Sequence, residues 1–172
     1  MPVQVQGKEP LRRLALAYAR LGDASNAERI ANQLARLYPT DMLLKNRDLP
    51  LVRAAIAVQQ NNPSRAIALL ESAVPTEPGN PDVAYTRGQA YLLLHRGTEA
   101  AAEFQKIIRY RGFLVNDPPG ALPYLGLARA YLMQGDTANA RAAYNDFLTL
   151  WKDADPDIPI LKQAKAEYAK LQ

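Results

Sequence analysis

The sequence predicts an all-α protein, a right-handed α-solenoid of about four helical hairpins followed by a capping helix. Two observations carry this prediction. A similar phrase of 14 residues occurs three times, at residues 14–27, 87–100 and 127–140, and self-similarity at a period of tens of residues is typical of solenoids. Alanine is abundant and β-branched residues are sparse, which favours helix over strand.

The length of 172 residues fits one domain by the usual size of domains. We expect a single repeat domain over residues 1–172. Its units are predicted at residues 8–40, 41–80, 81–119 and 120–154, with the capping helix at 157–171.

The first hairpin is predicted from residues 8–21 and 24–38, where apolar residues recur at the i, i+3, i+4 and i+7 spacing of one helix face. Gly22 should end the first helix because glycine tolerates the left-handed backbone conformation. Asp23 should cap the helix that follows.

The second hairpin is the most divergent. Residues 41–47 are compatible with either an extra helical turn or an extended start, and Pro50 is tolerated in the first turn of a helix that begins near Asp48. The Asn-Asn-Pro-Ser run at 61–64 marks the turn.

The remaining segments continue the pattern. An insertion at 111–120 lengthens the third unit, and its apolar Phe113, Leu114 and Val115 are expected to pack onto the stack. The last helix has one apolar and one lysine-rich face, which suits the end of a solenoid. The helices are predicted at residues 81–95, 98–111, 120–134, 137–151 and 157–171.

The repeated phrase resembles the tetratricopeptide repeat, a unit of two helices. A small residue lies three positions before the tyrosine of each phrase, and another lies nine positions after it. The resemblance implies that these small residues form structural seams, where the paired helices approach closely. His95 departs from the family pattern, because it replaces the turn glycine of the third unit. The predicted seam residues are Ala15, Ala27, Gly88, Ala100, Ala128 and Ala140.

A narrower likeness concerns residues 88–107 and 144–157. These stretches are similar to the C-terminal repeat region of bacterial serine/threonine kinase-type signalling proteins. The resemblance implies that the chain is the docking or sensory part of a larger bacterial signalling protein.

The family resemblance also implies a concave groove lined by the first helix of each hairpin, in which a peptide or protein segment binds. Arginines there could meet partner carboxylates as bidentate forks. Leu16 and Val52 stand where a carboxylate clamp of the family has asparagines, which argues against that clamp. Self-association of the parent protein is the alternative. The predicted partner-binding residues are Arg12, Leu16, Arg20, Tyr85, Gln89 and Arg129.

Catalytic and metal-binding interpretations fare poorly. The chain has no cysteine, and its single histidine, His95, falls in a predicted turn. The alternating aspartates of residues 153–157 lack the glycine and the glutamate of a calcium loop, so we interpret Asp157 as a helix cap. Trp151 is expected to pack between the fourth hairpin and the last helix. The sequence therefore predicts a noncatalytic chain without cofactor or metal.

The net charge of +4 comes mostly from the first third of the chain. The basic residues are dispersed along several helices, which favours a solvated basic surface over a nucleic-acid site. No apolar run approaches the length of a membrane span, and the first residues do not resemble a signal peptide. The lack of cysteine fits a reducing compartment, and we expect a cytoplasmic location.

Overall fold

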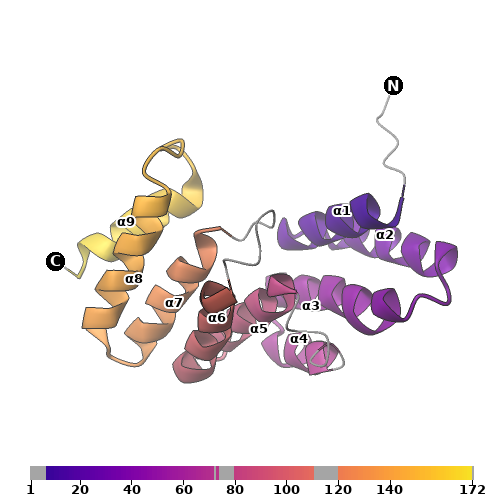
Figure 1. Ribbon diagram of the computed structural model, residues 1–172, viewed down its shortest axis with the longest axis horizontal. Helices are drawn as coiled ribbons and strands as arrows, with labels where there is room; N and C mark the ends of the chain where they lie inside the picture. The colour runs from indigo at the N-terminus through magenta and orange to yellow at the C-terminus, as the bar shows by residue number, and fades with distance from the viewer. Residues whose placement is uncertain (1–6, 72, 74–79, 111–119, 172) are drawn as a thin grey trace. The chain divides into compact units, whose positions relative to one another are not determined.

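A computed structural model describes residues 7–71, 73, 80–110 and 120–171. In these residues the regular structure is helical throughout (Figure 1), which confirms the all-α prediction. The predicted packing of Phe113, Leu114 and Val115 lies outside the described residues. The helices are α1 (Lys8–Arg20), α2 (Ala24–Leu37), the π-helical turn η1 (Leu44–Asp48), α3 (Leu49–Gln59), α4 (Pro63–Leu70), α5 (Pro81–Leu93), α6 (Gly97–Tyr110), α7 (Leu122–Met133), α8 (Thr137–Leu150) and α9 (Pro159–Ala169).

The chain divides into two compact units, Met1–Ala90 and Tyr91–Gln172. Each unit is described by itself. We call them the N-terminal unit and the C-terminal unit.

The turns inside the four helical hairpins of the described chain share one backbone conformation. Each contains one residue with positive φ, and the next residue donates its N–H to the carbonyl five positions earlier, at 2.8–3.0 Å. This is the Schellman arrangement, which usually requires glycine because a side chain crowds the left-handed backbone. The left-handed residues are Gly22 (φ 82°), Asn61 (φ 55°), His95 (φ 55°) and Gly135 (φ 75°).

The helix that follows each turn is capped in three of the four hairpins. Asp23, Asn62 and Asp136 each accept a hydrogen bond from the backbone N–H three residues later, at 3.0, 3.3 and 3.1 Å. Such caps satisfy donors that have no partner inside the helix. The third hairpin has Arg96 at this position, paired with Glu99. This hairpin therefore lacks both the turn glycine and the capping acceptor.

A wide helical turn precedes α3. Residues 44–48 are π-helical, and the N–H of Leu49 donates to the carbonyl of Leu44, five residues back. Pro50, which has no N–H to donate, follows directly. The extra helical turn, one of the two predicted alternatives for this segment, is thus present in π form. It places Leu44 in the core at 1% exposure and leaves Lys45 exposed.

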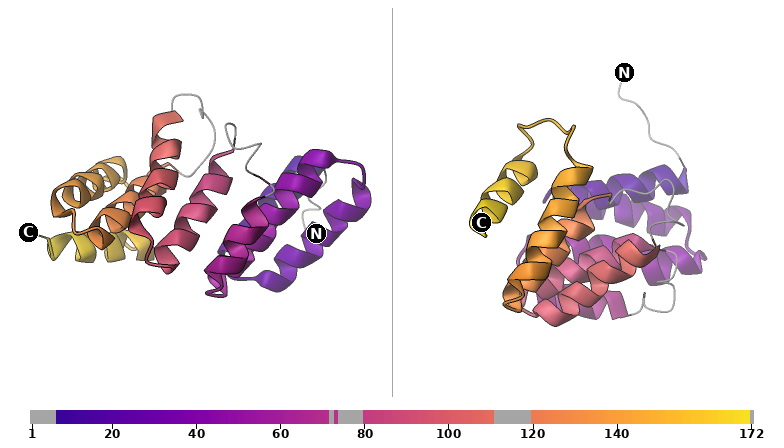
Figure 2. Two further views of the ribbon diagram at one scale, coloured as in Figure 1. Left: turned by 90° about the horizontal axis from the view of Figure 1, so that it is seen from below. Right: turned by 60° about the vertical axis from the view of Figure 1, so that its left-hand side comes forward.

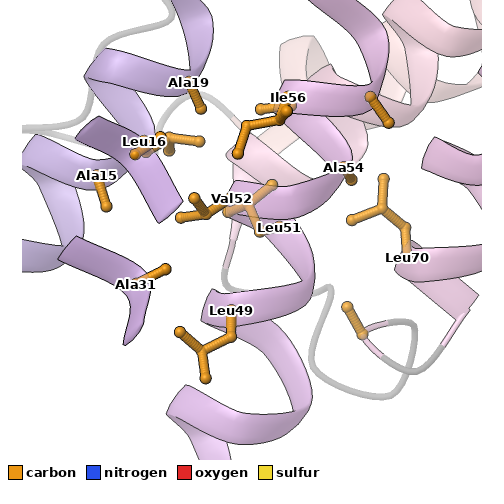
Figure 3. Close-up of a cluster of buried hydrophobic side chains, with 14 of the residues drawn as sticks. Ala15, Leu16, Ala19, Ala31, Leu49, Leu51, Val52, Ala54, Ile56 and Leu70 are labelled. Carbon is orange, nitrogen blue, oxygen red and sulfur yellow. The ribbon is translucent and has the colours of Figure 1, made fainter. Parts of the chain in front are cut away.

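The core of the N-terminal unit is built around α3, which packs against α1, α2 and α4. Leu16 of α1 points toward Leu51 and Val52 of α3, and Leu70 of α4 faces Ala54 from the other side of α3 (Figure 3). All five side chains are at most 5% exposed. Helix α3 is therefore apolar on both flanks, because it is covered on both.

In the C-terminal unit, glycine sets the spacing between α6 and α7. A Cβ atom on Gly126 would lie 2.5 Å from the ring of Phe104, and one on Gly97 would lie 2.8 Å from the carbonyl oxygen of Ala130. Both distances are shorter than van der Waals contact, and the Phe104 side chain is fully buried. Only glycine allows this approach of the two helices.

Helix α9 packs beside α8 through Leu161 and Ala164 (Figure 2). The N-cap residue of α9 is Ile158, which makes no side-chain capping bond, whereas Asp157 pairs with Lys162 at 2.8 Å. The predicted cap by Asp157 is therefore wrong, because its carboxylate turns outward to a lysine. Trp151 lies with its ring centroid 5.0 Å from that of Phe147.

A polar cluster also fastens α9. Glu167 accepts two hydrogen bonds from Arg129 of α7, both at 3.0 Å, and one from the Tyr144 hydroxyl of α8 at 2.8 Å. Burial works to raise the pKa of Glu167, but the hydrogen bonds from Arg129 and Tyr144 outweigh it and leave the pKa below its ordinary value. Burial and the bond to Glu167 raise the pKa of Tyr144. The cluster thus holds a charged carboxylate between three helices.

We predict that His95→Gly stabilises the protein by about 0.5–1 kcal/mol, because glycine adopts the left-handed turn without the crowding that histidine suffers. Gly135→Ala, at the equivalent turn, should destabilise it by about 1 kcal/mol or more. Urea unfolding followed by circular dichroism measures both. Leu21→Gly is the control. Leu21 has φ −80°, an ordinary right-handed conformation, so glycine there should destabilise the protein. A less stable His95→Gly would contradict the interpretation of this turn.

We predict that Glu167→Gln lowers the melting temperature at neutral pH, with a loss of about 1–3 kcal/mol for a partly buried ion pair that loses one member. Because the folded pKa lies below the ordinary value of 4.5, the stabilisation is complete above that pH and is lost as the pH falls through the folded pKa. The variant and the parent should therefore converge in acid.

Trp151, the single tryptophan, reports unfolding of the C-terminal unit by its fluorescence in this experiment. Glu71→Gln, at an exposed glutamate of the N-terminal unit, is the control and should leave the Trp151 transition in place. If Glu167→Gln and the parent differed in melting temperature by the same amount at neutral and at acid pH, that result would argue against the charged cluster.

Candidate functional site

The residues predicted to line a groove come from three helices. Arg12, Leu16 and Arg20 are on α1, and Tyr85 and Gln89 are on α5, all within the N-terminal unit. Arg129 is on α7 in the C-terminal unit. The structure brings some of the first five together and gives Arg129 a separate role.

Arg20 joins the end of α1 to the start of α5. Its Nη2 donates to Asp82 Oδ1 at 2.6 Å, and its guanidinium carbon lies 5.4 Å from the centroid of the Tyr85 ring. An arginine over an aromatic face gains a cation–π attraction. The Arg20 side chain is still 32% exposed, whereas that of Asp82 is 9% exposed. The guanidinium thus has two neighbours, while the Arg20 side chain as a whole stays partly exposed.

Asp82 is itself held firmly. Its backbone N–H donates to the side chain of Asn80 at 3.0 Å, and its carbonyl accepts the hydroxyl of Thr86 at 2.8 Å. Arg20 therefore pairs with a residue whose backbone is fixed at the start of α5. A guanidinium has five N–H donors, and a single hydrogen bond to Asp82 leaves donors for a second carboxylate.

Tyr85 and Gln89 lie one turn apart on α5, and both are half-buried. Tyr85 presents an aromatic ring beside Arg20, and Gln89 can both donate and accept hydrogen bonds. We call Arg20, Tyr85 and Gln89 the α1–α5 face. Its chemistry suits an extended peptide that carries an acidic group.

Arg12 and Leu16 do not belong to this face, and their predicted groove role is corrected here. Arg12 is 8% exposed and Leu16 is 5% exposed. Leu16 is covered because α3 packs against α1 (Figure 3). Arg12 folds back along its own helix, where its Nε and Nη2 donate to Glu9 at 3.0 and 2.6 Å. The hydrogen bond from Arg12 lowers the pKa of Glu9 to about 2.

Arg129 is committed to Glu167 by the two hydrogen bonds described above. Its side chain is 24% exposed. A partner carboxylate could reach Arg129 only in exchange for Glu167. The contact that the structure gives Arg129 is thus a structural one, which attaches α9 to α7.

The predicted seam residues are all buried, five of them with no exposed surface. Bulky Phe104 and Tyr144, each four residues after a seam alanine, are also fully buried. The seam residues are Ala15, Ala27, Gly88, Ala100, Ala128 and Ala140.

The acidic partners of Arg20 and Arg129 could not be predicted from the sequence. Asp82 lies 62 residues from Arg20, and Glu167 lies 38 residues from Arg129. Asp82 carries only the signal of an acid in a first helical turn, and Glu167 reads as one charge on a polar helix face. Neither signal names a partner.

Metal sites and membrane spans were also sought in the described residues. Among these residues, no group of three or more histidine, aspartate and glutamate side chains could hold a metal ion. None of the described helices combines the length and the hydropathy that crossing a bilayer requires.

Comparison with known proteins adds named relatives. Human mitochondrial import receptor subunit TOM70 is 26% identical over 171 residues, and the rat protein is 27% identical. Each match covers 98% of this chain but 27% of the relative. The chain thus spans about a quarter of the length of these curated relatives.

A solved structure of MamA (AMB-1) superposes with a TM-score of 0.59 at 20% sequence identity. The match covers 93% of this chain and 85% of that one. At this identity the likeness concerns the fold alone, and it agrees with the predicted α-solenoid class.

Family profiles give the most direct assignment. Two tetratricopeptide repeat profiles match the chain, one at residues 57–112 and the other at residues 11–41 and 124–154. Together these ranges include all four of the left-handed turns described above. Repeats of this kind form protein–protein interaction modules, and the chain belongs to the tetratricopeptide repeat family.

Proposed function

We propose that this chain is a noncatalytic interaction domain that binds a peptide or protein segment on the α1–α5 face. The observation that carries the proposal is Arg20, whose guanidinium bonds to Asp82 and lies over the Tyr85 ring while about a third of the whole side chain stays exposed. A fixed donor set binds at a lower entropy cost than a free side chain. Tyr85 and Gln89 supply contact area and adaptable hydrogen bonds beside it.

This proposal keeps three of the six residues that were predicted to line the groove. Arg12 and Leu16 are left out because they are buried, and Arg129 is left out because Glu167 occupies it. A concave surface shared by the first helices of a single 1–172 domain remains a prediction from the family resemblance, as does a cytoplasmic location.

We also propose that the chain is the docking or sensory part of a larger bacterial signalling protein. The likeness of residues 88–107 and 144–157 to such proteins supports this context. The alternative is a self-association module that dimerises the parent protein. Sedimentation of the chain over a wide concentration range separates the two, because a strict monomer would remove the alternative.

The proposed site is tested by substitutions on the α1–α5 face. We expect Tyr85→Ala or Gln89→Ala to weaken capture of the natural partner by about tenfold or more if the site is central to the interface. Photo-crosslinking from position 89 in cells, followed by mass spectrometry, identifies the partner. The helical circular dichroism should stay unchanged, because both residues are only half-buried.

Matched controls are Gln59→Ala and Arg65→Ala, at exposed residues of α3 and α4 in the same unit. They should leave capture intact. Arg129→Glu is a poor test, since it would place two carboxylates against each other at Glu167 and loosen α9. If the Tyr85 and Gln89 variants captured the partner as well as the parent does, the binding site would have to lie on another surface.

A further inference from the structure

Of the four exposed large apolar side chains described in the N-terminal unit, Leu21 stands apart and the other three lie close together in the sequence. Leu37 ends α2, and Met42 and Leu43 stand in the first turn of the helix that continues into η1. They are 55%, 64% and 49% exposed. Three large apolar residues exposed within seven positions form a patch of the kind that marks an interaction site.

The patch is bordered by cations that the fold leaves uncompensated. Arg36 and Lys45 are exposed, and within the described residues neither has an acidic partner. Arg29, on the same outer side of α2, bonds only to the amide oxygen of Asn26. Most other basic residues of the unit have an acidic neighbour, as Lys8 has in Asp41 at 2.6 Å and Arg47 has in Asp48 at 2.8 Å. We call Arg36, Leu37, Met42, Leu43 and Lys45 the α2–η1 edge.

The π-helical turn explains why this edge is apolar on the outside. It brings Leu44 to the core and leaves the two preceding residues outside. Leu44 is 1% exposed, although Met42 and Leu43 beside it are about half exposed or more. The apolar run at 42–44 is therefore split between the core and the surface.

We propose that the α2–η1 edge is a second docking surface, which binds an acidic partner segment that carries bulky apolar side chains. Charge complementarity supports this occupant, because the edge offers apolar contact between two unpaired cations. The proposal is independent of the α1–α5 face, which lies on other helices.

Two other occupants fit the edge less well. A helix that lies in a lipid surface needs its apolar face free to enter the bilayer, whereas α2 buries Ile30, Ala31 and Leu34 in the core. For a second copy of the chain, the exposed acids of the loop before α9 would be the natural counterpart. Two of those acids already have lysine neighbours, Asp153 at 4.0 Å and Asp157 at 2.8 Å.

Methionine methyl resonances test the proposal on the intact chain. Of the three methionines, Met42 lies on the edge, and Met133 in the C-terminal unit is a matched reference at 42% exposure. A short peptide of glutamate and leucine is titrated into methyl-labelled protein, with a lysine and leucine peptide as the charge control. We expect the Met42 signal to shift with the acidic peptide alone, while the Met133 signal stays in place.

Substitutions then separate charge from apolar contact. Arg36→Ser with Lys45→Ser should weaken peptide binding by about tenfold, the effect of two surface ion pairs, and Arg65→Ser should not. Leu37→Ser should weaken binding, whereas Leu150→Ser, at the same 55% exposure, should not. Tyr85→Ala should leave the Met42 shift unchanged. A failure of the proposal for the α2–η1 edge can therefore be told apart from a failure of the proposal for the α1–α5 face.

Other results would overturn the proposal. An unmoved Met42 signal, or equal shifts of both methionines, would mean that the edge does not select the acidic peptide. Broadening of Met42 by anionic lipid vesicles without a response to the peptide would assign the edge to a membrane surface. Concentration-dependent association that Leu37→Ser abolishes would assign it to a second copy.

Discussion

The left-handed residue at the tip of each hairpin is the constraint on which the rest of the fold depends. It fixes where one helix stops and the next begins, and so it fixes which side chains meet. In each hairpin a small residue lies seven positions before it and another lies five positions after it. These eight residues are buried, as Ala54 and Ala66 illustrate around Asn61. A turn longer by one residue would bring larger side chains to the seams and push the helices apart.

Local features of the sequence were sufficient to predict the hairpins. Apolar periodicity gave the helices, and the spacing of small residues around Tyr18, Tyr91 and Tyr131 gave the pairing. His95 was recognised as a substitute for glycine, and it does adopt the left-handed conformation. These features succeed because a hairpin is decided by residues within about thirty positions of one another, as expected of repeats that contact mainly their neighbours.

The candidate site was less predictable, since exposure depends on what closes over a helix. Leu16 and Arg12 have the spacing of groove residues, but packing of α3 and the nearby Glu9 remove them from the surface. The ion pairs of Arg20 and Arg129 join residues far apart in sequence. Three arginines that look equivalent in the sequence therefore end in three different environments. A carboxylate ligand would have to displace Glu167 to reach Arg129, whereas Arg20 keeps N–H donors beyond its bond to Asp82.

The wide turn at residues 44–48 also bears on how such repeats change length. Lys45 stands seven positions before Val52, a separation that returns to the same side of a regular α-helix. If the same residues formed a regular α-helix, Lys45 instead of Leu44 would point into the interior. The bulge absorbs one extra residue locally, so the helix keeps its apolar side while its start grows longer. A repeat array with this device tolerates insertions at its edges, where new contact surfaces can arise without repacking the interior.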